Sequence, residues 1–309
     1  MQDLNEYIHS LPPSIFGETN YNNIDINKLA SGCYNVNYLV KINNKHFVFR
    51  QNIHNDEQEG GQLGKEYETL KKLDGLHAPK ALYFRENILI EEFIQGEKIT
   101  KLTDKLIRRI AKALAKVHKH KNSSKSSGLK KFYENLFESR QNTLQKNQKI
   151  SAQLKTFIKK AKEYIHKKNS RFNQIKKTRL LHGDMHCGNI LQTDTDVILL
   201  DWENSGPGEP AFDIVAFFYE SENLQYFQNS ITDEQKELFI KEYLKHNFDQ
   251  NLREKIDIIY PLRWLSDTLW LASRIINYQQ LPEEAREKNK DEYERLYNLN
   301  IIKLQKLWL

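Results

Sequence analysis

The first hundred residues contain several short apolar segments with the character of strands. The stretch 29–40 predicts a strand, a tight turn and a second strand, and 45–50 predicts a strand that ends in a cation. Residues 87–96 form an apolar strand that runs into a turn. Between these strands, the apolar residues of 62–73 recur at helical spacing. The pattern therefore predicts a small β-sheet accompanied by a helix.

The spacing changes to a helical period after the strand at 87–96. Thr103 is placed to cap a helix that runs through Lys119, whose expected buried stripe is Leu106, Ile107, Ile110, Leu114 and Val117. Residues 130–177 also show helical spacing, and 122–128 is a polar, linker-like stretch. We expect the remainder of the chain to be mainly helical.

Two apolar runs, 190–191 and 197–200, predict short strands joined by a polar turn at 193–196. Such a hairpin is expected to fold Asp201 back beside Asn189, a few residues after Asp184. Phosphoryl transfer needs a carboxylate that accepts the proton of the acceptor hydroxyl, and oxygen ligands that hold Mg²⁺ against the phosphates. The stretch therefore suits this chemistry, with Asp184 as the proton acceptor and Asn189 and Asp201 as the metal ligands.

Two other interpretations of this stretch stay open. His182, Asp184 and His186 alternate as zinc ligands can, which would indicate a metallohydrolase. No second cluster of this kind follows in the sequence, so His182 is interpreted as a structural residue that braces the loop. The simplest alternative is an edge hairpin with solvated carboxylates.

The motif His-Gly-Asp-x-x-x-Gly-Asn-Ile-Leu at 182–191 is followed by Leu-Asp-Trp-Glu-x-Ser-Gly at 200–206 and Glu-Pro-Ala-Phe-Asp-Ile at 209–214. Together these segments resemble the aminoglycoside phosphotransferase and choline kinase superfamily. The resemblance implies a two-lobed, protein-kinase-like α/β fold (α+β), with ATP and Mg²⁺ as cofactors. It also implies an N-terminal, nucleotide-binding lobe over 1–94 and a larger, mainly helical lobe over 95–309 with the catalytic loop, metal site and substrate pocket.

The resemblance assigns nucleotide contacts to the N-terminal lobe. Ser31, Gly32 and Asn35 occupy the small-residue loop over ATP, with Ser31 where relatives often carry glycine. The strand at 87–96 corresponds to the hinge, where backbone groups near Glu91 and Phe93 would pair with adenine. Alone, each of these signals is also compatible with an ordinary hairpin or a buried strand.

Arg50 stands where a kinase strand carries its phosphate-binding cation, and its guanidinium could hold phosphate oxygens in a bidentate fork. The resemblance makes Glu66 its partner on the following helix, although Glu59 or Glu68 could substitute. Farther along the chain, Asp213 is expected to steady the catalytic loop by hydrogen bonds. His118 is interpreted as a structural residue.

A second group of residues is a candidate acceptor site. Trp264, Asp267 and Trp270 lie close together on a predicted helix over 256–276, and an aromatic wall with an acid suits a positively charged amine. Glu203, two residues beyond Asp201, is expected to complete the metal shell or to meet the acceptor. The alternative for the helix is that both tryptophans are core residues and that Asp267 pairs with a neighbouring arginine.

Charge is distributed unevenly along the 309 residues, whose formal net charge is +6. Residues 119–180 carry 18 Lys and Arg against 3 acidic residues, whereas 191–250 carry 13 acidic residues against 3 Lys. The acidic stretch favours a cationic acceptor. The aromatics of the basic stretch keep helical spacing, which argues against specific nucleic-acid binding.

No apolar run is long enough to span a bilayer, and the two cysteines cannot form a disulfide framework. We therefore expect a cytoplasmic, ATP- and Mg²⁺-dependent kinase that phosphorylates the hydroxyl of a small, cationic molecule such as choline, ethanolamine or thiamine. The alternatives are an aminoglycoside O-phosphotransferase and, from another class, a nucleotide-binding relative without catalysis.

Overall fold

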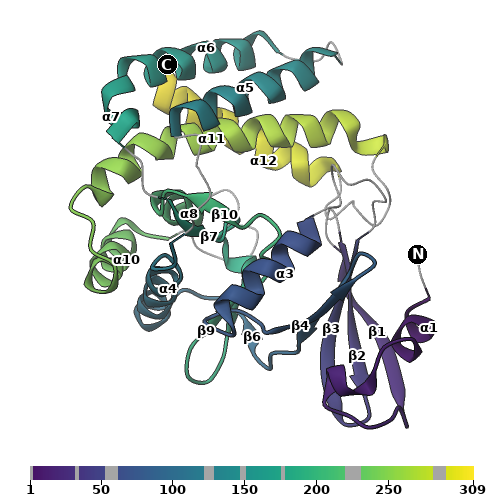
Figure 1. The fold of residues 1–309 in the computed structure, drawn as a ribbon. Coiled ribbons are helices and arrows are strands. Elements are labelled where there is room, and N and C mark those ends of the chain that lie inside the picture. The colour runs from purple at the N-terminus through teal and green to yellow at the C-terminus, as the bar shows by residue number, and fades with distance from the viewer. Residues whose placement is uncertain are drawn as a thin grey trace. The chain divides into compact units, whose positions relative to one another are not determined.

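The computed structural model describes residues 3–31, 35–52, 62–121, 129–146, 151–174, 178–219, 231–280 and 290–309. Contacts divide these residues into two units (Figure 1). Unit 1 comprises the described residues up to Glu97 together with Leu191–Ser205. Unit 2 comprises those from Lys98 to Ile190, from Gly206 to Gln280, and from position 290 onward.

Unit 1 is built on a five-stranded antiparallel sheet with the order β1-β2-β3-β5-β4. The strands are β1 (Ile24–Ser31), β2 (Asn35–Ile42), β3 (Lys45–Asn52), β4 (Ala81–Arg85) and β5 (Ile88–Glu92). Helix α3 (Gln62–Leu73) packs against β4 and β5. These elements confirm the strands and the helix that the apolar spacing predicts.

The core of unit 1 lies under the N-terminal segment. The helix α1 (Leu4–His9) and the 3-10 turn η1 (Pro13–Phe16) bury apolar side chains against β2, β3 and β5. The ring of Phe16 contacts those of Phe47 and Phe49, with centroids 5.0 and 6.1 Å apart. Burial of aromatic rings contributes much of the stability of a small sheet, so these contacts hold β3 in place.

The predicted hairpin at 190–200 is confirmed as β8 (Ile190–Gln192) and β9 (Val197–Leu199), and its turn is closed by the Thr193 N–H, which donates to Asp196. A short strand, β6 (Glu97–Lys98), lies on the other side of β8. The Leu199 N–H donates to the carbonyl of His77, which ties the end of β9 to the segment before β4. These contacts place Leu191–Ser205 in unit 1, whereas the sequence assigned them to the C-terminal lobe. The predicted boundary at residue 94 stays a prediction.

Unit 2 is mainly helical. Its helices are α4 (Asp104–Val117), α5 (Leu129–Lys146), α6 (Ala152–Lys167), α7 (Asn169–Gln174), α8 (Ala211–Phe218), α10 (Asp233–His246), α11 (Leu252–Asn277) and α12 (Lys290–Trp308), with the 3-10 turns η2 (Cys187–Asn189) and η3 (Tyr278–Gln280). Two strands, β7 (Arg179–Leu181) and β10 (Gly206–Gly208), pair antiparallel.

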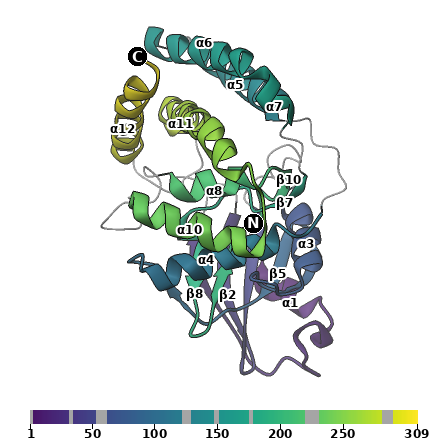
Figure 2. The same cartoon turned by 90° about the vertical axis from the view of Figure 1, so that its left-hand side faces the viewer.

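Helix α4 confirms the predicted cap and stripe. The Thr103 hydroxyl accepts the N–H of Leu106, and all five stripe residues are buried. The buried face packs against α10, and Figure 2 shows the two helices side by side. Helix α10 begins with a capping box in which Thr232 and Gln235 satisfy each other's backbone N–H groups. Both helices thus begin at capped residues, and the C-terminal residues of α4 and α10 contribute to the site described below.

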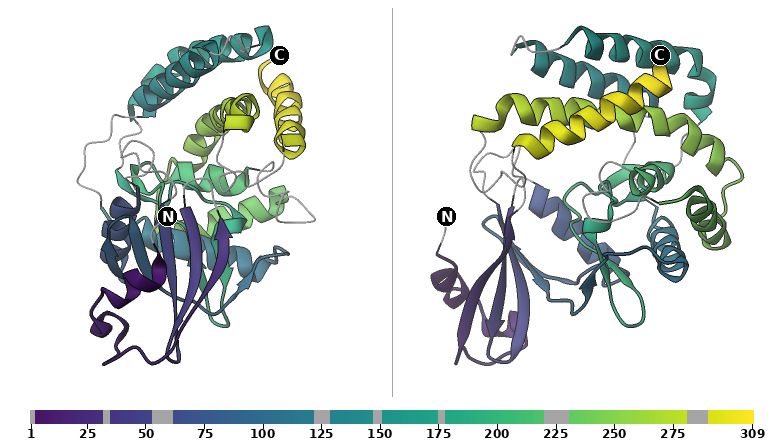
Figure 3. Two further views of the ribbon diagram at one scale, coloured as in Figure 1. Left: turned by 90° about the vertical axis from the view of Figure 1, so that its right-hand side faces the viewer. Right: turned by 180° about the vertical axis from the view of Figure 1, so that it is seen from behind.

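The long helix α11 is the packing centre of the rest of unit 2, where it contacts α5, α6, α8 and α12. Figure 3 shows α12 lying along α11. Among the described residues, we find no helix with the length and apolar character required to cross a bilayer. The cytoplasmic location stays a prediction.

Candidate functional site

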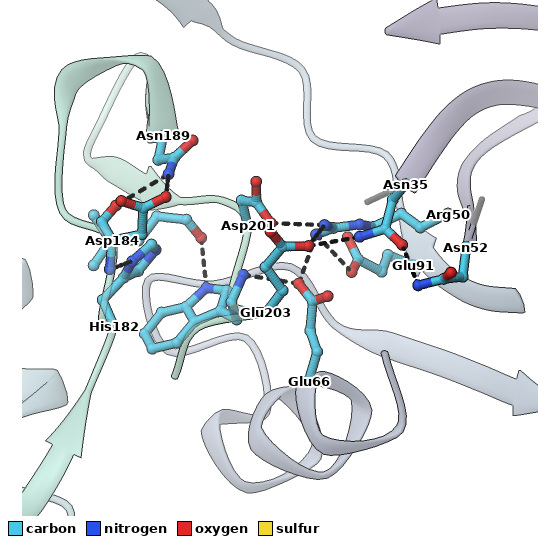
Figure 4. Close-up of polar contacts among 12 residues, drawn as sticks. Asn35, Arg50, Asn52, Glu66, Glu91, His182, Asp184, Asn189, Asp201 and Glu203 are labelled. Carbon is cyan, nitrogen blue, oxygen red and sulfur yellow. Dashed lines mark hydrogen bonds and ion pairs between the residues drawn. The ribbon is translucent and has the colours of Figure 1, made fainter. Parts of the chain in front are cut away.

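In unit 1, a buried guanidinium gathers the predicted acidic residues (Figure 4). Arg50 on β3 donates through Nη1 to Glu66 Oε1 at 2.6 Å and through Nη2 to Asp201 Oδ1 at 2.7 Å. Its side chain is 6% exposed, and that of Glu66 is fully buried. The predicted pairing of Arg50 with Glu66 on α3 is thereby confirmed. Glu68 is exposed, and Glu59 lies outside the described residues.

This cluster contains more carboxyl groups than cations. Glu203 and Glu91 lie 3.8 and 4.0 Å from the guanidinium of Arg50, so four carboxylates surround one cation. Burial by itself lowers the pKa of Arg50, but the four carboxylates outweigh burial and hold that pKa well above its ordinary value. Buried carboxylates are costly unless paired, so the cluster favours the addition of a further cation.

Glu91 shows most directly the effect of placing more carboxyl groups than cations in a buried cluster. Burial raises its pKa from an ordinary value of 4.5 to about 7, against the opposing effect of Arg50. Its Oε1 has no hydrogen-bond partner among the described residues. The sequence singled out Glu91 for its backbone, whereas the structure shows that its side chain belongs to the Arg50 cluster.

The shifted pKa of Glu91 makes stability pH-dependent with a defined sign. Because the folded protein holds this proton more tightly than the unfolded chain, stability falls as the pH rises from about 4.5 to about 7, by an amount on the order of 3 kcal/mol. Glu91→Gln should flatten this fall in urea-unfolding free energies measured from pH 5 to pH 8. The exposed residue Glu97 provides the control substitution Glu97→Gln, and an unchanged slope in Glu91→Gln would contradict the prediction.

The segment that carries Asp201 is fixed by its neighbours. Asp201 has a left-handed φ of +64°, an unusual conformation for a residue with a side chain. The following Trp202 is fully buried, and its backbone N–H donates to Glu66 Oε1 at 2.8 Å. The hydroxyls of Thr69 on α3 and Ser205 lie 2.9 Å apart, also buried. Asp201, by contrast, keeps 37% of its side chain exposed, so it is held in place yet accessible.

The predicted loop residue Asn35 contacts the same segment. Its Nδ2 donates to Glu203 Oε2 at 2.6 Å, and its Oδ1 accepts a hydrogen bond from Asn52 Nδ2 at 3.3 Å (Figure 4). Asn35 and Asn52 are register partners at the paired ends of β2 and β3. Ser31 is the last residue of β1, and Gly32 lies outside the described residues. Unit 1 therefore joins the start of β2 to Glu203 by side-chain hydrogen bonds.

In unit 2, the loop 182–189 brings Asp184 and Asn189 together. The Nδ2 of Asn189 donates to the backbone carbonyl of Asp184 at 3.0 Å and lies 3.5 Å from its Oδ2. This bond directs the amide nitrogen of Asn189 to the loop and leaves Oδ1 as the atom suited to a metal. The Asp184 side chain is 29% exposed and lies 3.8 Å from His186 Nε2.

The prediction that Asp213 steadies this loop is confirmed. Its two carboxylate oxygens accept the backbone N–H groups of His182 at 2.7 Å and Gly183 at 2.9 Å. Burial raises the pKa of Asp213, but hydrogen bonds from His118 and Gly183 and the nearby histidines outweigh burial and hold that pKa below its usual range. The Asp184 N–H in turn donates to His182 Nδ1 at 3.3 Å, so His182 braces the loop as predicted.

The zinc alternative gains no support from the residues that the structure describes. No group of three or more His, Cys, Asp or Glu side chains among them is arranged to hold a metal ion. His182 and His186 each use Nδ1 to accept a backbone N–H within the loop. A magnesium site differs from such a cage because it uses few protein ligands and relies on waters and phosphates for the rest.

The candidate acceptor residues of α11 are engaged within unit 2. Trp264 is 3% exposed, and its ring contacts that of Tyr219 at 4.5 Å. Asp267 accepts a hydrogen bond from Arg263 Nε at 2.6 Å. The Trp270 ring packs on Tyr293 and lies under the guanidinium of Arg274 on the same helix. These contacts match the alternative for Trp264, which is a core residue, and for Asp267, which pairs with an arginine, whereas Trp270 is only partly buried. The role of the three residues in acceptor binding stays a prediction.

Other residues complete the comparison with the sequence. Phe93 directly follows β5, and its ring lies 5.8 Å from that of His46. Sequence reasoning missed Asn52, the hydroxyl pair of Thr69 and Ser205, and a hydrogen-bonded tyrosine, Tyr243. Of these, Asn52 could be placed only once the register of β2 and β3 was known, since it stands opposite Asn35.

A small antiparallel sheet whose strand cation pairs with a helix carboxylate, together with a mainly helical unit that carries a braced His-Gly-Asp loop, defines a kinase-like phosphotransferase. Residues 25–257 match the family described as "Phosphotransferase enzyme family". The chain therefore belongs to that family, and the predictions of a superfamily member and of a kinase-class enzyme are confirmed at the level of the family.

Curated relatives and solved structures agree with this assignment. Thiamine kinase of Escherichia coli O1:K1 / APEC is 24% identical over 191 residues, which cover 62% of this chain and 65% of the relative. The alignment thus leaves about a third of that relative uncovered. A choline kinase from Cryptosporidium parvum Iowa II superposes with a TM-score of 0.69 at 19% identity, over 99% of this chain and 96% of its own.

A ternary complex of the aminoglycoside phosphotransferase APH(2")-IIa with streptomycin and ATP gives a TM-score of 0.65 at 18% identity, over 98% and 99% of the two chains. At these identities the structural matches establish the fold. The predicted α/β, kinase-like fold class is thereby confirmed.

Proposed function

We propose that the protein transfers the γ-phosphoryl group of ATP to a hydroxyl of a small molecule, with Mg²⁺ as the metal. The observation that carries this proposal is the Arg50 cluster, in which an accessible Asp201 is held beside a buried cation and a surplus of carboxyl groups. Membership of the phosphotransferase family and the fold shared with an ATP complex support it.

The chemistry of the proposed ligands suits magnesium. Asn189 would supply an amide oxygen and Asp201 a carboxylate, and both are hard ligands of the kind that Mg²⁺ prefers. The carboxyl-rich cluster of unit 1 adds electrostatic attraction for a divalent ion. When bound, Mg²⁺ neutralises the charge that develops on the phosphates. Glu203 is a further candidate ligand for the metal or the acceptor.

Asp184 is the proposed general base. The acceptor hydroxyl gives its proton to the Asp184 carboxylate while its oxygen forms a bond to the γ-phosphorus, and the bond between that phosphorus and the bridging oxygen breaks to release ADP. The braced loop supports this role, because the backbone on both sides of Asp184 is held by Asp213 and Asn189. A fixed carboxylate needs little reorganisation during the transfer.

Nucleotide binding is proposed for unit 1. Ser31, Gly32 and Asn35 would approach the phosphates, and backbone groups near Glu91 and Phe93 would pair with adenine. Arg50 would act at the phosphates through Asp201, since both of its terminal nitrogens are engaged in the structure.

For the acceptor we propose a cationic alcohol of the thiamine, choline or ethanolamine kind. The acidic stretch 191–250 supports a cation, as do the substrates in the names of the thiamine kinase and choline kinase relatives. The engaged side chains of α11 lend less support to Trp264, Asp267 and Trp270 as its binding residues. An aminoglycoside is the second candidate, favoured by the fold shared with the streptomycin complex.

An ADP-release assay with thiamine, choline, ethanolamine and a panel of aminoglycosides tests the proposal. We expect Mg²⁺-dependent ADP release with one cationic alcohol and little without an acceptor. Release with an aminoglycoside alone would favour the second candidate. ATP binding without turnover on any acceptor would favour the relative without catalysis.

A further inference from the structure

A series of linked hydrogen bonds, here called the hydrogen-bond chain, runs through the core of unit 2 to the loop 182–189. Asn247 Nδ2 donates to Tyr243 Oη at 3.0 Å, and Tyr243 Oη lies 2.8 Å from His118 Nδ1. His118 Nε2 lies 3.0 Å from Asp213 Oδ2, the oxygen that also accepts the His182 N–H at 2.7 Å. The chain links the C-terminal ends of α10 and α4 to the start of α8.

The chemistry of the two ends limits the directions of these bonds. An amide nitrogen only donates, so the Tyr243 oxygen accepts from Asn247. An ionised carboxylate only accepts, so His118 Nε2 donates to Asp213. The Tyr243 hydroxyl and His118 Nδ1 share the remaining hydrogen bond, which holds the imidazole ring between Tyr243 and Asp213.

Because these residues are buried, breaking a bond of the hydrogen-bond chain costs free energy. His118, Asp213 and Tyr243 are at most 1% exposed, and the His118 ring also packs against the Tyr243 ring. A buried polar atom that loses its hydrogen-bond partner is no longer compensated for its lost contact with water. Without the Tyr243 hydroxyl, the His118 ring would therefore move or find another partner. Any such movement is passed to Asp213, which holds the two peptide N–H groups just before Asp184.

We propose that Tyr243 is a positioning residue of the phosphotransferase site, which sets the orientation of His118 and, through Asp213, the geometry of the loop that carries Asp184. The catalytic half of this inference rests on the proposed function, whereas the structural half stands without it. Asn247 extends the chain to the half-buried end of α10.

Tyr243→Phe tests the inference, because it removes the hydroxyl and keeps the ring. We expect amide hydrogen exchange at His182 and Gly183 to become about tenfold faster. With the active acceptor, kcat should fall about tenfold with little change in the KM for ATP. In nitrogen NMR, the His118 Nδ1 signal of the wild type should shift in the variant, because the hydroxyl that shares a hydrogen bond with this nitrogen is removed.

Tyr133→Phe is the matched control. Tyr133 is equally buried in unit 2, but its hydroxyl has no hydrogen-bond partner among the described residues. The inference is overturned if exchange at the loop is unchanged in Tyr243→Phe, if it rises equally in Tyr133→Phe, or if it rises while kcat stays at the wild-type value. Should Tyr243→Phe fail to fold, Asn247→Ala must give a smaller change of the same sign. If the wild type transfers no phosphate to any acceptor, the proposed function fails, while the exchange and NMR measurements still decide whether Tyr243 holds the loop.

Discussion

Asp184→Ala is expected to lower kcat by about 10²- to 10⁴-fold, the usual contribution of a general base, while ATP binding changes little. The backbone of the loop does not depend on this carboxylate, since the Asp184 carbonyl accepts the bond from Asn189 and its N–H donates to His182. The loss should therefore be one of chemistry. Steady-state ADP release gives kcat, and calorimetric titration with ATP and Mg²⁺ gives the affinity.

The exposed Asp233, at the start of α10, supplies the control substitution Asp233→Ala, which removes a carboxylate from the same unit without touching the loop. Turnover in Asp184→Ala within a factor of a few of the wild type would contradict the assignment of the base. A large loss of ATP affinity in the same variant would instead place Asp184 in nucleotide binding.

Local signals were sufficient to predict the elements. Strand-like apolar patterns gave β2, β3 and β5, and the Thr103 cap and apolar stripe gave α4. The hairpin at 190–199 also followed from a short local pattern, whereas the support of the loop by Asp213 followed from the family resemblance. Where the spacing of residues determined the contact, sequence reasoning succeeded.

Contacts between distant segments were harder to predict. The bond of Asn52 to Asn35 depends on strand register, and the Tyr243–His118 bond depends on how α10 packs on α4. Neither register nor helix packing leaves a local signature. The α11 residues illustrate the converse, because an aromatic and acidic face favours a ligand in the sequence while packing and Arg263 engage it in the structure.

The sequence also could not predict the electrostatic state of the Arg50 cluster. The sequence reasoning paired Arg50 with Glu66 and identified Asp201 separately, but the electrostatics of the cluster depend on burial, which only the folded structure reveals. Glu91 entered the cluster because β5 pairs with β3 in a register that places it opposite Val48, two residues from Arg50. The surplus of carboxyl groups around Arg50 thus depends on how the strands of the sheet pair.

The Arg50 cluster leads to the second large prediction, which concerns stability. Arg50→Met should lower the free energy of unfolding by about 3–5 kcal/mol at neutral pH, because it leaves the buried carboxyl groups of Glu66 and Glu91 without the guanidinium that lies beside them. Arg50→Lys keeps the charge but loses the fork that reaches both Glu66 and Asp201, so it should cost less stability and still impair turnover. Urea unfolding followed by circular dichroism measures the first effect, and ADP release measures the second. If Arg50→Met unfolds at the wild-type urea concentration, the buried ion pair does not stabilise unit 1, and the electrostatic argument for a bound cation weakens with it.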